Sequence, residues 1–347
     1  MSAILSDDPS DLAAQALALL FEGRDATREQ ARALFERLVA GNLPEPLMAA
    51  AFVSLKLKGE TSQELTGAVE ALRAATRSFA RPDGLFADSC GTGGDGSGSI
   101  NVSTAAGLVA ASCGLPVVKH GNRSVTSKCG SADVLEELGA RLDVPPEQSR
   151  TIVDETGFCF LLAPLYHPGI AHAGPVRRQL KVRTIMNLLG PCLNPARPPV
   201  QLLGVADPQL MRPIAETLLA VGVERGLVVH GSGLDEIAPH AETQAIRISD
   251  GRLEELALTP EDAGFERRPL DQIAGGCPED NAKRLTDLLH GQGSDADLQV
   301  VALNAGALLW VAGVADSFMA GAEQASEAMT SGQAGGTLDR FLEASRG

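Results

Sequence analysis

A glycine-rich stretch after Asp88 is the part of the sequence best suited to hold a phosphate group. Five glycines fall between Gly91 and Gly98, and glycine lets the main chain adopt positive φ and approach a ligand closely. Successive N–H groups in such a loop, followed by the N-terminus of a helix, form a binding site for anions. A flexible linker is the alternative, but an apolar helix is expected directly afterwards, over residues 105–113. We therefore expect a phosphate cradle.

The same glycines also match the G-x-G-x-x-G spacing of a dinucleotide-binding loop, from Gly91 to Gly96. That fingerprint needs a helix that begins at its last glycine and an acidic residue about 20 positions later, which binds the ribose hydroxyls. Here the helix cannot begin before residues 101–104, and the next strand ends in Lys119 and His120. Basic residues at that point favour further phosphate over a ribose, so a nicotinamide cofactor is disfavoured.

Two short segments after the loop could act with it. Residues 101–104 begin the next helix, where an asparagine and two hydroxyls can cap the helix, ligate a cation or bind a phosphate. Residues 119–124 put a lysine, a histidine and an asparagine into one tight turn. A lone Lys or His is more often a surface or core residue, but this local density favours a site.

Asp235 and Glu236 are adjacent carboxylates that follow a predicted strand. Mg²⁺ binds through one or two carboxylates together with the phosphates of a substrate, so beside a phosphate cradle this pair suggests a magnesium clamp. Taken alone, such a pair at the start of a helix is more often only a favourable partner of the helix dipole. The metal interpretation therefore depends on the neighbouring cradle.

The distribution of charge indicates a small anionic ligand. The chain has 29 basic and 44 acidic residues and a net charge of −15, which argues against a nucleic-acid surface. Residues 96–132 and 156–206 nevertheless contain no Asp or Glu and together hold eight Lys or Arg. In the second stretch, His167, Arg177 and Arg183 offer a place for a carboxylate in an arginine fork. The alternative is a satisfied loop histidine and solvated arginines.

Length and composition set further limits. With 347 residues, 44% of them hydrophobic, the chain can bury one large core together with a smaller satellite domain. It contains no run of 18 apolar residues and no secretory signal pattern, so we expect no membrane span and no export. Its six cysteines form no CxxC pair and no metal spacing, which indicates reduced thiols in the cytoplasm.

The first 80 residues predict a small helical bundle with a face suited to dimer formation. Two of its helices begin at capping boxes, at Thr27-x-x-Gln30 and Thr61-x-x-Glu64. Residues 177–194 also have helical periodicity and are expected to rejoin this bundle.

From residue 81 onward, short apolar strands alternate with helices, which indicates crossover units and a mainly parallel sheet. The predicted strands are 85–87, 115–118, 158–162, 200–205, 227–230 and 244–248, and the predicted helices are 104–113, 132–139, 147–156, 208–221 and, with glycine breaks, 297–345. In such sheets ligands bind at the carboxyl ends of the strands. Asp88, Lys119, His120 and His230 are expected at or just past those ends.

Together these motifs resemble the anthranilate phosphoribosyltransferase family, in register over nearly the whole chain. The residues that carry the resemblance are Lys58-Gly-Glu-Thr61, Gly91-Thr-Gly-Gly-Asp-Gly96, Asn101-Val-Ser-Thr104, Lys119-His-Gly-Asn-Arg123, Ser127, Gly130-Ser-Ala-Asp-Val-Leu-Glu136, Val176-Arg177-Arg178, Arg183-Thr-Ile-Met-Asn-Leu-Leu-Gly-Pro191, Leu234-Asp235-Glu236 and Asn304-Ala305.

The resemblance implies an α/β fold of the nucleoside phosphorylase and class IV phosphoribosyltransferase kind. A small N-terminal helical bundle, residues 1–80 with 176–196 packing back onto it, would accompany a larger α/β domain with a mainly parallel central sheet, residues 81–175 and 197–347. A ligand cleft at the hinge, a homodimer through the N-terminal helices and a cytoplasmic location are also implied.

The resemblance further implies a Mg²⁺-dependent transfer of phosphoribosyl from 5-phosphoribosyl 1-pyrophosphate to the amine of anthranilate, a step of tryptophan biosynthesis. By resemblance, phosphoribosyl pyrophosphate contacts Gly91, Gly93, Gly94, Asp95, Ser99, Asn101, Ser103, Thr104, Lys119 and Ser131. Anthranilate contacts Gly91, His120, Asn122, His167 and Arg177, the last through its carboxylate. The catalytic residues would be Lys119, Asp235 and Glu236, and the metal ligands Ser103, Asp235 and Glu236.

The sequence departs from the family pattern at two places, and three other functions can be weighed against it. Ser232 stands where the family often has Asp, and Gly169-Ile170 stands where Ala-Met is commoner. A nucleoside phosphorylase-like enzyme would need a nucleobase pocket, whereas Arg177 favours a carboxylate. An inactive nucleic-acid-binding relative should be basic. An inactive structural paralogue would be expected to have lost Lys119, Asp235 or Glu236.

Overall fold

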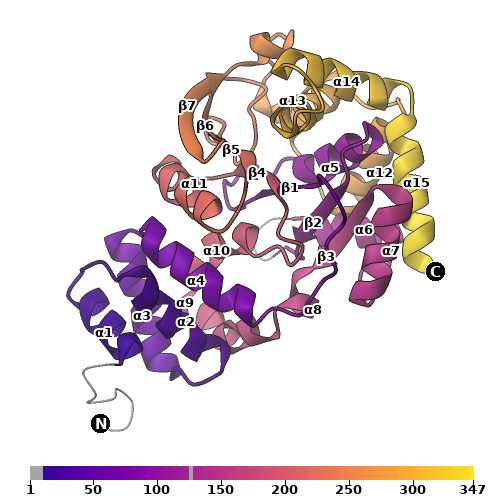
Figure 1. The fold of residues 1–347 in the computed structure, drawn as a ribbon. Coiled ribbons are helices and arrows are strands. Elements are labelled where there is room, and N and C mark those ends of the chain that lie inside the picture. Colours follow the sequence, from indigo (N-terminus) through magenta and orange to yellow (C-terminus); the bar gives the residue numbers. More distant parts are fainter. Residues whose placement is uncertain (1–10, 125–127) are drawn as a thin grey trace. The chain divides into compact units, whose positions relative to one another are not determined.

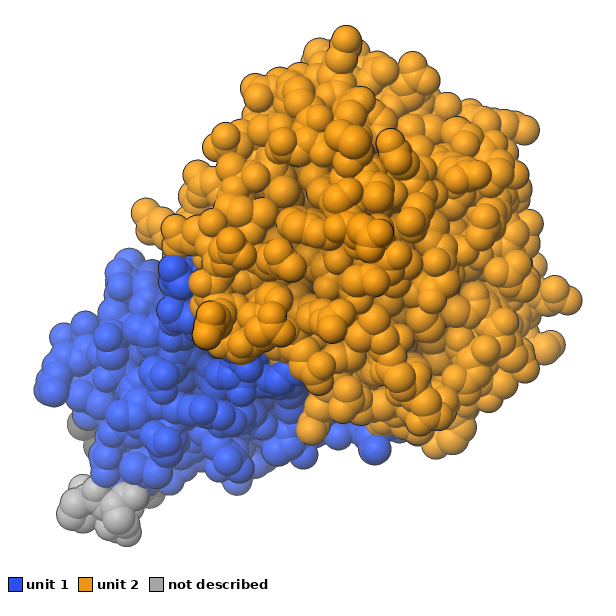
Figure 2. Space-filling model, turned by 45° about the horizontal axis from the view of Figure 1, so that its top comes forward, with its two compact units in different colours: residues 1–78, 164–195, 212–222 blue, residues 79–163, 196–211, 223–347 orange. Residues whose placement is uncertain are grey.

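The computed structural model describes residues 11–124 and 128–347, so Ser127 of the resemblance lies outside the described residues. The chain divides into two compact units (Figure 2). Unit 1 comprises the described residues up to 78 together with 164–195 and 212–222. Unit 2 comprises residues 79–163, 196–211 and 223–347.

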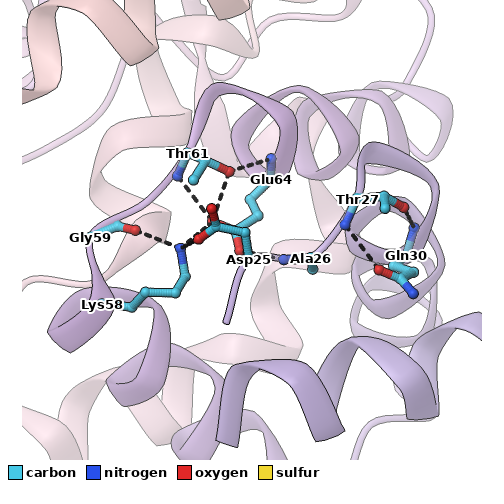
Figure 3. Close-up of polar contacts among 8 residues, drawn as sticks. All are labelled: Asp25, Ala26, Thr27, Gln30, Lys58, Gly59, Thr61 and Glu64. Carbon is cyan, nitrogen blue, oxygen red and sulfur yellow. Dashed lines mark hydrogen bonds and ion pairs between the residues drawn. The ribbon is translucent and has the colours of Figure 1, made fainter. Parts of the chain in front are cut away.

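Unit 1 is helical, with bounds set largely by its capping residues. Both predicted capping boxes are present (Figure 3). The hydroxyls of Thr27 and Thr61 accept hydrogen bonds from the N–H groups of Gln30 and Glu64, and the backbone N–H groups of the two threonines donate to the side chains of Gln30 and Glu64. The helices are α1 Leu12–Phe21, α2 Arg28–Val39, α3 Glu45–Lys58, α4 Ser62–Ala74, α8 Ala163–Tyr166 at the unit boundary, α9 Gly174–Leu180, α10 Ile185–Leu189 and α11 Met211–Ala220, with short 3₁₀ turns η1 Pro168–Ala173 and η2 Gly190–Cys192.

Two segments that the sequence analysis assigned to the α/β domain, 164–175 and 212–222, group with unit 1. Hydrogen bonds join both segments to α4 and the residues that follow it. Arg73 donates to the carbonyl of Val221 at 2.9 Å, and the N–H of Arg77 donates to the carbonyl of Tyr166 at 2.8 Å. Residues 177–194 do not form one helix, since Lys181 takes the left-handed conformation at the end of α9 and a new helix begins at Ile185.

Unit 2 is built on a mainly parallel sheet, as predicted, in the order β3-β2-β1-β4-β5-β6-β7 (Figure 1). Its strands are β1 Ala87–Gly91, β2 Val117–Gly121, β3 Phe158–Leu162, β4 Val200–Gly204, β5 Arg225–His230, β6 Thr243–Ser249 and β7 Arg252–Leu258. Strands β1 to β5 are parallel neighbours, whereas β6 and β7 are antiparallel. The hairpin turn between β6 and β7 is formed by Asp250 and Gly251, both with positive φ. An Asp-Gly pair is a sequence signal of a hairpin and could have predicted the missed strand β7.

Helices cover the sheet of unit 2. They are α5 Val102–Ser112, α6 Ser131–Glu137, α7 Pro146–Thr156, α12 Pro278–Leu289, α13 Asp295–Ala312, α14 Phe318–Thr330 and α15 Gln333–Arg346, with 3₁₀ turns η3 Pro208–Leu210, η4 Pro260–Ala263 and η5 Leu270–Ile273. Helix α13 is buried on nearly all sides because it packs against β4 and β5 and also against α5 and α14 (Figure 1). In the part of the chain that is described, no helix is long and apolar enough to cross a bilayer.

The expected positions at the strand ends are correct for β2 and β5 but wrong for Asp88. Lys119 and His120 lie in the last three residues of β2, and His230 ends β5. Asp88 is instead the second residue of β1 and fully buried. The reason is that β1 continues to Gly91, which pairs with Gly204 of β4.

Candidate functional site

The glycine-rich loop follows β1 and bends back on itself through left-handed backbone. Gly93, Gly94, Gly96 and Gly98 all have φ between 60° and 76°, a backbone conformation that residues other than glycine rarely adopt. Gly91 needs glycine for a different reason, because a Cβ atom there would overlap the carboxylate of Asp235. The sequence thus allows the loop to lie directly against the segment that follows β5.

Three carboxylates gather where the loop meets that segment. The N–H of Gly93 donates to Asp235 Oδ2 at 2.6 Å, and the N–H of Asp235 lies 3.5 Å from Asp95 Oδ2. Burial, followed by the charge of Asp95, raises the pKa of Asp235 to about 7. Burial and the charge of Asp235 raise the pKa of Glu236 well above its usual range, although its carboxylate accepts the N–H of Ser103. We call Asp95, Asp235 and Glu236 the acid cluster.

A single buried lysine stands opposite these acids. Lys119 is 2% exposed, and its Nζ donates to the carbonyl of Ser89 and to Ser103 Oγ, the latter at 3.1 Å. Its charge also favours the ionised form of Glu236. Ser103 therefore joins the lysine to the acid cluster through its hydroxyl and its N–H group.

The oxygen donors of this site suit a hard cation. Carboxylate and hydroxyl oxygens are the ligands that Mg²⁺ prefers, usually one or two carboxylates completed by substrate phosphates. Within the described residues, no group of three or more His, Cys, Asp or Glu could by itself hold a metal ion. Asp235, Glu236 and Ser103 fit the smaller set that Mg²⁺ takes from a protein.

The other residues predicted to contact phosphoribosyl pyrophosphate hold the surrounding backbone in several ways. The amide of Asn101 donates to the carbonyl of Cys129 at 3.2 Å and accepts from Asn281 at 3.0 Å. Ser99 pairs with Ala274 in an isolated β-bridge. Ser131 donates to the carbonyl of Asn122 at 3.3 Å.

Thr104 differs from these residues because its side chain points into the core. It is fully buried in α5, and its hydroxyl has no hydrogen-bond partner among the described residues. A phosphate contact through the hydroxyl of Thr104 stays a prediction, and it would require this buried side chain to become accessible to the ligand.

The residues predicted to contact anthranilate belong to both units and are described within each. In unit 2, His120 is buried and its N–H lies 3.4 Å from Asp88 Oδ1, while Asn122 is exposed on the turn after β2. In unit 1, His167 is 5% exposed and its Nδ1 lies 3.0 Å from Thr76 Oγ1. Burial lowers the pKa of His167 to about 4, so the ring is neutral at pH 7.

Arg177 is a half-buried cation on α9. Burial alone lowers the pKa of its guanidinium. No acid among the described residues forms an ion pair with it, whereas the neighbouring Arg178 is exposed. A guanidinium that has lost water without gaining a carboxylate is suited to an anionic ligand.

The two departures from the family pattern have local explanations. A Cβ atom on Gly169 would overlap Val39 of α2, so the alanine that is commoner at this position would not fit here. Ser232 adopts positive φ and donates to the carbonyl of Glu242 at 2.7 Å. It therefore supports the turn before the acid cluster and does not add to the carboxylates.

Sequence reasoning missed two parts of the site. Asp95 was placed in the pyrophosphate loop, but its position beside Asp235, 140 residues away in the sequence, was not foreseen. Asn281, which contacts Asn101, was not singled out at all. Neither contact has a local sequence signal, because each depends on how distant loops meet.

Comparison with protein families matches both parts of the chain. Residues 83–335 match the family described as glycosyl transferase family, a/b domain, and residues 14–76 match the glycosyl transferase family, helical bundle domain. The anthranilate phosphoribosyltransferase of Sorangium cellulosum is 55% identical over 327 residues, which are 94% of each chain.

Two solved structures are similar throughout. The anthranilate phosphoribosyltransferase of Thermus thermophilus has a TM-score of 0.91 at 41% identity, over 96% of this chain and 99% of its own. That of Saccharomyces cerevisiae, in complex with PRPP and Mg, has a TM-score of 0.87 at 24% identity, over 98% of this chain and 99% of its own. The second similarity establishes the fold.

Proposed function

The chain belongs to the anthranilate phosphoribosyltransferase family, and on that premise we propose that it transfers the phosphoribosyl group of 5-phosphoribosyl 1-pyrophosphate to the amine of anthranilate. The products are N-(5-phosphoribosyl)anthranilate and pyrophosphate, and the step belongs to tryptophan biosynthesis. The observation that carries this proposal is that the glycine loop, Lys119 and the acid cluster lie together in unit 2, joined by the bonds of Gly93 to Asp235 and of Lys119 to Ser103.

Catalysis of this reaction depends on electrostatic stabilisation more than on proton transfer. The sugar carbon gains positive charge as pyrophosphate leaves, and the leaving group needs stabilisation. The N–H groups of the glycine loop and the ammonium of Lys119 supply fixed positive charge for this purpose. Bound Mg²⁺ would be held by Ser103, Asp235 and Glu236 and would neutralise part of the pyrophosphate charge; the yeast relative was solved with both PRPP and Mg.

The raised pKa values of Asp235 and Glu236 support this assignment. Asp235 is buried beside Asp95, and Glu236 lies beside Asp235 with Lys119 as the cation that favours its ionised form, so the negative charge of this cluster is only partly neutralised. Such perturbed groups cluster at functional sites. A cation that arrives with pyrophosphate would let both acids ionise, so metal and substrate binding would support each other.

For the acceptor substrate we assign Gly91, His120, Asn122, His167 and Arg177. Arg177 would bind the carboxylate of anthranilate, because it is a half-buried guanidinium with no acid partner in the described chain. The amine of anthranilate is already neutral at pH 7, so no strong base is required. This agrees with the lowered pKa of His167, which keeps that ring uncharged.

We further propose a cytoplasmic homodimer without nucleic-acid partners. All six cysteines are free thiols, as expected in a reducing compartment. The exposed apolar side chains of unit 1 include Phe21 on α1, 47% exposed, and Leu57 on α3, 81% exposed, which supports an interface through the N-terminal helices. The net charge of −15 supports the lack of a nucleic-acid surface.

The direct test is incubation of the protein with anthranilate, phosphoribosyl pyrophosphate and Mg²⁺, followed by the loss of anthranilate fluorescence. We expect a loss that requires all three components and stops when EDTA is added. A parallel incubation with nucleosides and inorganic phosphate tests the phosphorylase-like alternative. Phosphorolysis there, without consumption of anthranilate, would reject the proposed function.

A further inference from the structure

A short segment after η5 is attached to the far end of the glycine loop. The N–H of Ile100 donates to the carbonyl of Ile273 at 3.0 Å, and the N–H of Gly275 donates to the carbonyl of Gly98 at 2.7 Å. These two bonds flank the β-bridge between Ser99 and Ala274. Residues 272–277, which we call the strap, therefore hold the end of the loop at which α5 begins.

The strap lies close to the loop because two glycines leave room for it. A Cβ atom on Gly275 would overlap the backbone of Ser99 and the side chain of Asn281, and one on Gly276 would overlap the carboxylate of Asp280. The contact between strap and loop is thus made by backbone atoms.

Arg284 of α12 fixes the strap from the other side. Its guanidinium binds both carboxylate oxygens of Asp297 and also donates to the carbonyls of Ala274 and Gln272. The side chain of Asp297 is only 4% exposed. A bidentate arginine–carboxylate pair of this kind is geometrically specific, so the strap is a rigid support for the loop.

Asn281 connects the strap to a residue of the site. It is 3% exposed; its Oδ1 accepts the N–H of Gly276 at 2.8 Å, and its Nδ2 donates to Asn101 Oδ1 at 3.0 Å. The amide of Asn101 in turn donates to the carbonyl of Cys129. Asn281 therefore determines which way the amide of Asn101 faces and ties together the glycine loop, the strap and the turn that precedes α6.

We propose that Asn281 is a positioning residue for phosphoribosyl pyrophosphate, which acts by orienting the amide of Asn101 at the end of the glycine loop. The inference rests on the proposed function, since it names the substrate that this loop binds. It assigns Asn281 no contact with the substrate. Arg284 supports the same arrangement one step further away.

The test compares two substitutions that break different bonds. Asn281→Ala loses both side-chain bonds, whereas Asn281→Asp keeps the acceptor for the N–H of Gly276 and loses the donor to Asn101. Both variants break the bond to Asn101, so we expect each to raise the KM for phosphoribosyl pyrophosphate by about tenfold or more, since one lost buried hydrogen bond amounts to about that factor. The KM for anthranilate should stay within about twofold, and calorimetric titration with phosphoribosyl pyrophosphate and Mg²⁺ should show the same weakening without turnover.

A double-mutant cycle with Asn101→Ala shows whether Asn281 acts through Asn101. In that background, Asn281→Asp should have no further effect on phosphoribosyl pyrophosphate binding, because the bond that it breaks is already absent. The matched control is Gln299→Ala, which removes an equally buried amide that binds Arg268 and the carbonyl of Glu266 and does not contact the loop. It should lower stability without changing either KM.

Two results would overturn the inference. One is an Asn281→Asp variant with wild-type affinity for phosphoribosyl pyrophosphate, and the other is an undiminished effect of Asn281→Asp in the Asn101→Ala background. If Asn281→Ala does not fold, Asn281→Asp alone decides, since it keeps the strap attached. Failure of the proposed function is distinguishable, because the wild-type protein itself would then neither consume anthranilate nor bind phosphoribosyl pyrophosphate.

Discussion

Each unit holds a group of charged side chains that are buried or partly buried, and the two groups are balanced in opposite ways. In unit 1, Glu64 is 1% exposed and accepts four hydrogen bonds: from the N–H of Ala26, the N–H and hydroxyl of Thr61, and Lys58 Nζ (Figure 3). In unit 2, the acid cluster brings three carboxylates together against one buried lysine, Lys119.

The difference separates a structural ion pair from a site prepared for a ligand. In unit 1, the buried carboxylate of Glu64 has the ammonium of Lys58, which also pairs with the exposed Asp25, and enough N–H and O–H donors. This is the condition under which a buried charge is tolerated. In unit 2 three carboxylates face one ammonium, and the raised pKa values of Asp235 and Glu236 record this imbalance of charge. Excess buried charge of this kind is retained where a cation or substrate completes it.

The largest expected effect comes from removing the acids of unit 2. The double substitution Asp235→Ala and Glu236→Ala should lower kcat by about a thousandfold or more, because electrostatic stabilisation of the leaving group by a metal amounts to several kcal/mol. Thermal stability of the metal-free protein should not fall, since the buried Asp235 and the partly buried Glu236 repel each other without the metal. The assay is anthranilate fluorescence together with a thermal melt. Near-normal Mg²⁺-dependent turnover would mean that the acid cluster is structural, like its counterpart in unit 1.

The opposite outcome is expected for the ion pair of unit 1. Glu64→Ala leaves two N–H groups without their buried acceptor, whereas Lys58 keeps Asp25 and the carbonyl of Gly59. The free energy of unfolding should therefore fall by about 3 kcal/mol. The kcat of the folded fraction should be unchanged. Urea unfolding measures the first quantity and turnover per folded molecule the second.

A matched control for Glu64 lies on the same helix. Glu70 pairs with Arg28 across α2 and α4 at a partly exposed position, so Glu70→Ala should reduce the free energy of unfolding by about 1 kcal/mol or less. Equal losses for Glu64→Ala and Glu70→Ala would show that burial does not distinguish the two pairs.

Dependence on pH sharpens the comparison because the two units respond with opposite sign. Asp235 has a pKa raised to about 7, so between about pH 4 and 7 the folded state holds a proton that the unfolded state has lost, and stability falls as pH rises. His167 has a pKa lowered to about 4, so between about pH 4 and 6.5 the unfolded state binds the proton, and stability is lost as pH falls.

The measurement is urea unfolding at several pH values for the metal-free wild type and two variants. Relative to Asp235→Asn, the wild type should lose about 3 kcal/mol between pH 4 and 7; relative to His167→Gln, it should gain a similar amount between pH 4 and 6.5. Parallel curves of unfolding free energy against pH for the wild type and Asp235→Asn would show that burial and Asp95 do not raise the pKa of Asp235.

The features that the sequence predicted correctly are those with a local physical signal. The capping boxes at Thr27 and Thr61 depend on residues three positions apart, and the parallel sheet follows from strands that alternate with helices. The extent of β1 was underestimated because Asp88 is polar, although its strand is buried on both sides by β2 and β4. The bonds that join Asp95 to Asp235 and Asn281 to Asn101 span 140 and 180 residues, so they become visible only once the chain has folded.

Arg177 provides a third case, a cation of unit 1 that has no acid among the described residues. Arg177→Ala should raise the KM for anthranilate by roughly 10- to 150-fold, the equivalent of about 1.5–3 kcal/mol for a charge-assisted hydrogen bond. The control is Arg178→Ala, because Arg178 is the exposed neighbour on the same helix. Initial rates at varied anthranilate measure the effect. An unchanged KM would remove Arg177 from the site and leave its lost hydration unexplained.

The smallest effect separates the two capping boxes of Figure 3, which have the same local geometry in different surroundings. Thr27→Ala removes an exposed cap and should reduce the free energy of unfolding by about 0.5–1 kcal/mol. Thr61→Ala removes a cap whose hydroxyl also donates to Glu64 at 3.0 Å, so its loss should reach about 2 kcal/mol. In a Glu64→Gln background this excess should shrink, because a neutral amide accepts hydrogen bonds less strongly than a carboxylate. Equal losses for the two threonines would mean that the N–H groups and Lys58 already satisfy Glu64, and the balance inferred for unit 1 would then not depend on the hydroxyl.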